Sequence, residues 1–125
     1  MLFVCWRATG WRQVLWVLKE IFVENSKATF VVIAEFKVPA RSREEFLELS
    51  RFDSERSLAE EAGCRQFDVS TGEEAQDIVV FYEVYDDRAA FDVHTTMPHF
   101  ATFSEGLQRL GVETVGVRFF HRLYA

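Results

Sequence analysis

The stretch VVFYEVYDDRAAFDVHTTMPHFATF, residues Val79 to Phe103, combines an aromatic-rich strand with a helical region that carries two histidines around a proline. Pro98 has no backbone N–H to extend a helix, so we expect one helix to end before it and another to begin there. Asp87 is suited to cap the first helix, which we expect to run through His94. The stretch therefore predicts a strand followed by two helices, with His94 and His99 on either side of the break.

The residues before this stretch predict a strand, a helix and a second strand. Hydrophobic alternation predicts strands over residues 29–38 and 66–70, the latter antiparallel to the run 78–85. Ser42 and Glu45 form a capping-box pair, so we expect a helix over 43–62 that ends at Gly63 as a left-handed cap. Its expected apolar face comprises Phe46, Leu49, Phe52, Leu58, Ala59 and Ala62. Its expected solvated acidic face comprises Glu44, Glu45, Glu48, Glu60 and Glu61.

The residues after Pro98 complete a recognisable topology. Apolar residues recur on one helical face until Gly111, and residues 113–123 alternate as a last strand. The order β–α–β–β–α–β predicts an α+β, ferredoxin-like fold, in which helices cover one face of a four-stranded antiparallel sheet. The other face of such a sheet needs a cover, and a second sheet is the natural one. We therefore expect a homodimer that packs sheet against sheet.

Composition limits the function classes. A chain of 125 residues fits one domain, and 49 % hydrophobic content with 13 Phe favours an apolar ligand pocket or a subunit interface. The net charge of −6 argues against nucleic-acid binding, which needs a basic footprint. Cys5 and Cys64 are too few and too scattered for a disulfide framework, which favours a reducing, cytoplasmic setting.

Residues 1–28 differ from the rest, because they hold all three tryptophans: Trp6, Trp11 and Trp16. Charged residues interrupt the apolar positions, so neither a signal peptide nor a membrane span of about 20 apolar residues fits. We expect an extension, helical or disordered, ahead of a domain over 29–125. It could dock on its own subunit or a partner, anchor at an interface, or be upstream sequence included by a start codon placed too early.

Four segments together resemble the antibiotic biosynthesis monooxygenase domains: FVVIAEFKVPARSREEFLEL (30–49), GCRQFDVSTG (63–72), VVFYEVYDDRAAFDVH (79–94) and TMPHFATF (96–103). The resemblance implies a dimeric α/β-barrel in which each subunit encloses a cavity between its sheet and its helices. It does not settle the reaction.

Within such a cavity His94 and His99 are the expected acid–base residues, because histidine titrates near neutrality. The side chains expected to bind substrate are Phe67, Tyr82, Glu83, Tyr85, Phe91, Phe100 and Phe103. Tyr82 and Glu83 point to opposite faces of their strand, so both cannot line one pocket. Glu83 needs a partner, which could be Arg65 or Arg118 across the dimer sheet unless it is a catalytic carboxylate. His121 is expected to be structural.

No nucleotide-binding or serine-hydrolase motif is present, and no further His or Cys stands at ligand spacing, so we expect neither cofactor nor metal. The leading hypothesis is a cofactor-independent monooxygenase that deprotonates a quinol or phenol with a His base. HTTMPHF also resembles the phospho-autoinducer isomerases of the same family, whose anionic substrate would need a cationic clamp. Haem degradation is disfavoured, because the haem-degrading members of the family resemble one another through an Asn, a Trp and a His in the pocket. Here all three tryptophans lie outside the domain. A non-catalytic module that binds a small molecule or stabilises a partner stays open.

Overall fold

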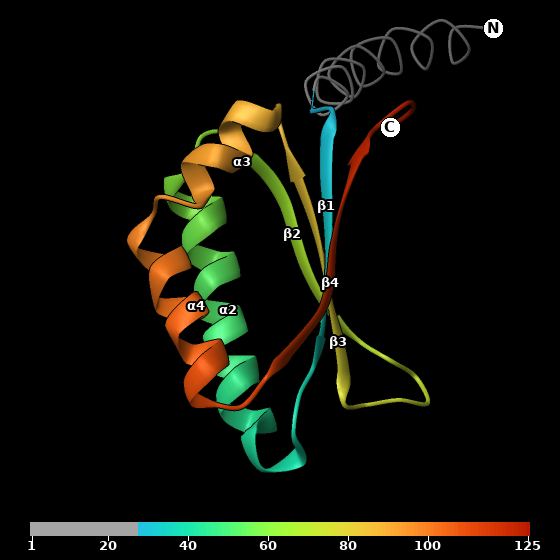
Figure 1. Ribbon diagram of the computed structural model, residues 1–125. Helices are drawn as coiled ribbons and strands as arrows, with labels where there is room; N and C mark the ends of the chain where they lie inside the picture. Colours follow the sequence, from blue (N-terminus) through green and yellow to red (C-terminus); the bar gives the residue numbers. More distant parts are fainter. Residues whose placement is uncertain (1–27) are drawn as a thin grey trace, which may run out of the picture.

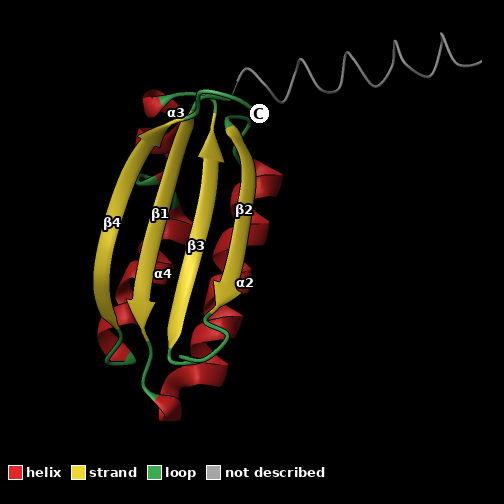
Figure 2. Ribbon diagram, turned by 90° about the vertical axis from the view of Figure 1, so that its right-hand side faces the viewer, coloured by secondary structure: helices red, strands yellow, loops and turns green. Residues whose placement is uncertain are grey.

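The computed structural model describes residues 28–125, so residues 1–27 of the expected extension lie outside the described residues. The elements are β1 (Phe30–Lys37), a 3-10 turn η1 (Ala40–Ser42), α2 (Arg43–Glu60), β2 (Cys64–Thr71), β3 (Ile78–Tyr85), α3 (Arg88–His94), α4 (Pro98–Arg109) and β4 (Glu113–His121). The strands form one antiparallel sheet in the order β2-β3-β1-β4. All the described helices cover one face of the sheet (Figures 1 and 2). The opposite face, called the open face below, carries no described helix, although Val31 and Val84 on it are buried. The predicted α+β ferredoxin-like fold is confirmed.

The side of α2 that faces the sheet matches the predicted apolar face only at Phe46, which is buried, and at Leu49, which packs against the core. Phe52 is 39 % exposed and Leu58 is 47 % exposed, so both point outward. The buried side instead carries Phe46, Ser50, Asp53 and Ser57, spaced three or four residues apart as the helical period requires. The hydroxyls of Ser50 and Ser57 donate to backbone carbonyls four residues earlier. The helix therefore presents a polar side to the interior.

Two of the four predicted helix-end features are confirmed and two are wrong. Asp87 caps α3 by accepting a hydrogen bond from the Ala90 N–H, and Gly111 adopts a left-handed φ of 68° after α4. Ser42 makes no capping box, since its hydroxyl donates to the Leu110 carbonyl at 2.7 Å. Gly63 is not left-handed. A Cβ at Gly63 would lie 2.5 Å from the Ala90 Cβ, so packing against α3 explains the glycine.

The core between sheet and helices is built from phenylalanines. Phe81 on β3 lies 4.9 Å from Phe36, 5.2 Å from Phe103 and 6.3 Å from Phe46, measured between ring centroids. These edge-on, tilted and stacked contacts lie within the distance range in which aromatic rings attract one another. The edge strand β4 is less covered, with Val117 and Phe119 each 45 % exposed. The described helices are too short or too polar to cross a membrane.

Candidate active site

A cavity of about 170 Å³ lies between the sheet and the helices. Its apolar lining is Val32, Ala34, Phe36, Phe81, Phe91, Phe100, Phe103, Leu107 and Val117, and its polar lining is Asp53, Glu83, His94, Ser104 and Thr114. A dry apolar cavity of about 150 Å³ is large enough to hold benzene, so this one has room for about one substituted ring. None of the described residues that line it is a lysine or an arginine.

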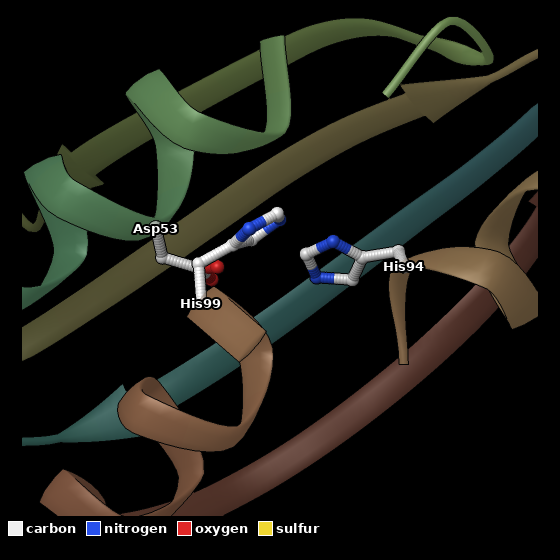
Figure 3. A group of neighbouring side chains, drawn as sticks. All are labelled: Asp53, His94 and His99. Atoms are coloured by element: carbon white, nitrogen blue, oxygen red, sulfur yellow. The ribbon is translucent and has the colours of Figure 1, made fainter. Parts of the chain in front are cut away.

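The two predicted histidines meet at one end of this region. His94 is the last residue of α3, and His99 follows Pro98 in the first turn of α4, so the proline break brings the two rings to 5.7 Å between centroids. Both side chains are buried, and Figure 3 shows them pointing toward each other and toward Asp53 of α2. The break that the sequence predicts is thus what pairs the histidines.

Glu61 connects the pair. Its Oε2 lies 2.9 Å from His94 Nδ1 and 2.5 Å from His99 Nε2, and its side chain is only 3 % exposed. The prediction that Glu61 belongs to a solvated face is therefore wrong. A carboxylate only accepts hydrogen bonds, so both nitrogens act as donors and Nε2 of His94 is left with a free lone pair. Because His94 also lines the cavity, it is the histidine placed to accept a proton there.

The surroundings of His94 keep it neutral. Burial lowers the pKa of His94, the hydrogen bond and charge of Glu61 oppose this by raising it, and His99 lowers it further. The rings of Phe67, Tyr85 and Phe100 lie 5.1–6.0 Å from the imidazole. A neutral imidazole in an aromatic shell suits a general base.

Two carboxyl groups complete the polar side of the cavity. Asp53 is 1 % exposed and its Oδ1 has no hydrogen-bond partner, whereas Glu83, 5 % exposed, accepts a hydrogen bond from the Tyr85 hydroxyl at 2.7 Å. Burial, followed by the charges of Glu83 and Glu61, raises the pKa of Asp53 to about 8. Burial also raises the pKa of Glu83 to about 7, although the Tyr85 hydrogen bond lowers it. Both groups thus retain protons far above the usual range of a carboxyl.

Within the described residues, neither of the expected arginines forms an ion pair with Glu83. Arg65 donates to Asp86 at 2.7 Å. Arg118 pairs with Ile33 across the sheet, on the face opposite to Glu83, which pairs with Val32. Within one subunit the partner of Glu83 is Tyr85, and an ion pair with an arginine across a dimer sheet stays a prediction.

The other predicted site residues divide into three groups. Glu83, Phe91, Phe100 and Phe103 line the cavity with His94. Phe67 and Tyr85 pack around the His94 ring, and His99 reaches it through Glu61. Tyr82 lies on the open face, 36 % exposed, and does not line this cavity.

Sequence reasoning missed Asp53, Ser57 and Glu61. The Ser57 hydroxyl lies 3.3 Å from His94 Nδ1, so all three surround the histidines. Asp53 and Ser57 could have been found from their spacing along α2, because Phe46, Ser50, Asp53 and Ser57 recur every three or four residues and so share one helical face.

A cation is a second way to use the same side chains. Asp53, His94 and His99 each offer one ligand atom, and these atoms lie within 4.8 Å of one another. Ligands around a tetrahedral first-row cation at about 2.1 Å stand about 3.4 Å apart, so the side chains would have to move closer together. The hydrogen bonds of Glu61 to both rings instead fit an acid–base cluster.

Comparisons with known proteins agree with this fold. The family model described as antibiotic biosynthesis monooxygenase matches residues 29–106. An uncharacterized protein from Synechocystis is 34 % identical over 83 residues, which is 66 % of this chain but only 56 % of that protein.

Solved structures share this fold. One, described as a candidate antibiotic biosynthesis monooxygenase from Nitrosomonas europaea, has a TM-score of 0.69 and 23 % identity over 76 % of this chain and 99 % of its own. A Pseudomonas aeruginosa protein has a TM-score of 0.63 and 26 % identity over 78 % of this chain and 94 % of its own.

Proposed function

The chain belongs to the antibiotic biosynthesis monooxygenase family, and we propose that its cavity carries out the cofactor-independent monooxygenation of a small quinol or phenol. One observation carries the proposal: a neutral histidine, oriented by a buried carboxylate, stands in the wall of an apolar cavity large enough for one aromatic ring. A general base and a water-poor cavity are what this reaction requires of the protein, because the deprotonated substrate itself reacts with dioxygen.

In the proposed reaction His94 Nε2 takes the phenolic proton, and Glu61 holds the imidazole in the required tautomer. The electron-rich phenolate gives electrons to dioxygen. One oxygen atom bonds to a ring carbon, and the other leaves as water with the hydrogens of the phenol O–H and the ring C–H. A phenol and O₂ thus become a quinone and H₂O. The aromatic walls hold the ring and exclude water.

The cavity argues against an isomerase with a phosphorylated substrate. Such a substrate needs cationic side chains, whereas the lining of the cavity provides two carboxyl groups, Asp53 and Glu83, and no described Lys or Arg. A binding module would use the same cavity without turnover. The His94–Glu61 pair favours catalysis, because mere binding of an apolar ring does not need an oriented base.

Replacement of the proposed base tests the function. A positioned general base contributes about 10²–10⁴-fold in rate, so His94→Ala should lower turnover by that order on an active quinol. His121→Ala is the matched control, because His121 contacts Phe30 on β1 and does not line the cavity. Oxygen consumption would be followed with a panel of quinols, beside a sugar-phosphate isomerisation assay. Isomerisation without oxygen uptake, or an unaffected His94→Ala enzyme, would contradict the proposal.

A further inference from the structure

We propose that Asp53 is a second catalytic residue: a neutral carboxylic acid that donates a hydrogen bond to the oxygen atom that His94 deprotonates. Its effect is to make the cavity specific for uncharged rings that carry a phenolic or carbonyl oxygen. The substrate class rests on the proposed function, whereas the protonated state of Asp53 and its binding of an oxyanion do not.

The position of Asp53 leaves one of its carboxyl oxygens available to a ligand in the cavity. It lies on the inward side of α2, is 1 % exposed, lines the cavity, and has an oxygen without a hydrogen-bond partner. A buried polar atom of this kind is costly unless it is satisfied, and here a ligand in the cavity can satisfy it. Structural serines nearby differ, because Ser50 and Ser57 are both satisfied by backbone carbonyls.

The charged and titratable neighbours favour the protonated form. They are Glu61 after α2, Cys64 on β2, Glu83 and Tyr85 on β3, His94 on α3 and His99 on α4. Two of these groups are carboxyls, and both histidines direct a hydrogen bond to Glu61. An ionised Asp53 would face these carboxyls in a buried site, which favours the neutral acid. The pKa of Asp53, raised to about 8 mainly by burial, agrees with this.

Distance allows Asp53 and His94 to act on one atom. One carboxyl oxygen of Asp53 and one imidazole nitrogen of His94 lie within 4.8 Å of each other, and both side chains line the cavity. Because a hydrogen bond to oxygen spans about 2.8 Å, a substrate oxygen placed between the two side chains can contact both. His94 removes the proton from that oxygen, and the Asp53 hydroxyl then donates to the oxyanion that is left. A carboxylic acid kept neutral by its surroundings is an effective donor to such an oxyanion.

Infrared spectroscopy tests the protonated state without any substrate. At pH 7 the wild-type protein should show a C=O band of a protonated carboxyl group that disappears in Asp53→Asn. Glu83→Gln serves as the reference variant, because Glu83 is the other cavity carboxyl with a raised pKa. In the wild type the Asp53 band should titrate away near pH 8. A protonated-carboxyl signal that is unchanged by Asp53→Asn would overturn the proposal.

Binding of 4-nitrophenolate tests the donor role. Asp53→Leu removes the donor and should weaken binding about tenfold or more, whereas Asp53→Asn keeps a neutral donor and should lose no more than about threefold. Above pH 8 the affinity of the wild type should fall, because Asp53 becomes an anion facing an anion, while that of Asp53→Asn should stay level. Equal losses in the Asn and Leu variants would show that a neutral donor at this position does not bind the oxyanion and would overturn the proposal. Stoichiometric Zn²⁺ binding that Asp53→Asn abolishes would also overturn it.

These readouts separate the two proposals. If the band and the binding pattern appear but no quinol is turned over, the proposed function fails and the role of Asp53 stands. If a quinol is oxidised but the Asn and Leu variants lose activity equally, only the role of Asp53 fails. If Asp53→Leu does not fold, the infrared comparison of the wild type with Asp53→Asn still tests whether Asp53 is protonated.

Discussion

At the scale of single residues, the site depends on one carboxylate that serves two imidazoles. Glu61 Oε2 contacts both His94 and His99, so one oxygen sets the orientation of the whole pair. The histidines were predictable because His and Pro98 are distinctive in sequence. Glu61 was not, because a glutamate that follows a helix with five other glutamates has the pattern of a solvated face, and only the end of α2 turns it inward.

Glu61→Gln should separate positioning from binding. Loss of the orienting carboxylate of a catalytic triad costs about 10⁴-fold, so we expect a loss in kcat of about 10²-fold or more with little change in KM. Glu61 raises the pKa of His94, so its removal should also move the acid limb of the pH–rate profile to lower pH. Glu55→Gln, on the exposed side of α2, is the control. A variant that keeps both its kcat and its pH profile would show that Glu61 is merely structural.

At the scale of elements, the strands were more predictable than the face of α2. Residues 29–38, 66–70 and 113–123 alternate, and a period of two leaves little freedom in which side is buried. In α2 the apolar residues Phe52 and Leu58 were expected to face the sheet, but both are exposed. The cavity and the histidines lie between this part of the helix and the sheet. Tertiary contacts therefore selected Ser50, Asp53 and Ser57 for the inward side.

The polar side of α2 should make folding stability depend on pH. Asp53 has a pKa of 3.8 when unfolded and about 8 when folded, so the folded state holds a proton that the unfolded state has lost. Stability from this group should therefore fall as pH rises between about 4 and 8. Glu83 acts in the same direction up to about pH 7, whereas His94, with a lowered pKa, costs stability as pH falls below 6.5.

Urea unfolding at pH 5, 7 and 9 measures the effect. Asp53→Asn does not titrate, so relative to the wild type it should gain stability at pH 9 and lose that advantage at pH 5. Ser54→Ala, on the outer side of the same helix, should shift all three midpoints equally. A constant difference between Asp53→Asn and the wild type across this range would contradict a proton held by Asp53 in the folded state.

At the scale of the whole molecule, the open face of the sheet has the pattern of an interface. Ile33, Tyr82 and Arg118 pair across β1, β3 and β4 on this face, and Phe120 pairs there with Val31. Tyr82 is 36 % exposed and Phe120 is 43 % exposed. We propose that a second copy of the chain covers this face. The predicted domain boundary between residues 28 and 29 stays a prediction.

A charge on the open face should prevent this pairing. A stable interface buries about 800 Å² on each partner, and an unpaired carboxylate at its centre is strongly disfavoured. We therefore expect light scattering to give a dimer for the wild type and a folded monomer for Phe120→Asp. Leu58→Asp is the matched control, because Leu58 is 47 % exposed on α2, on the far side of the helices. If the wild type is already monomeric at micromolar concentration, or if both variants stay dimeric, the open face is not where the subunits meet.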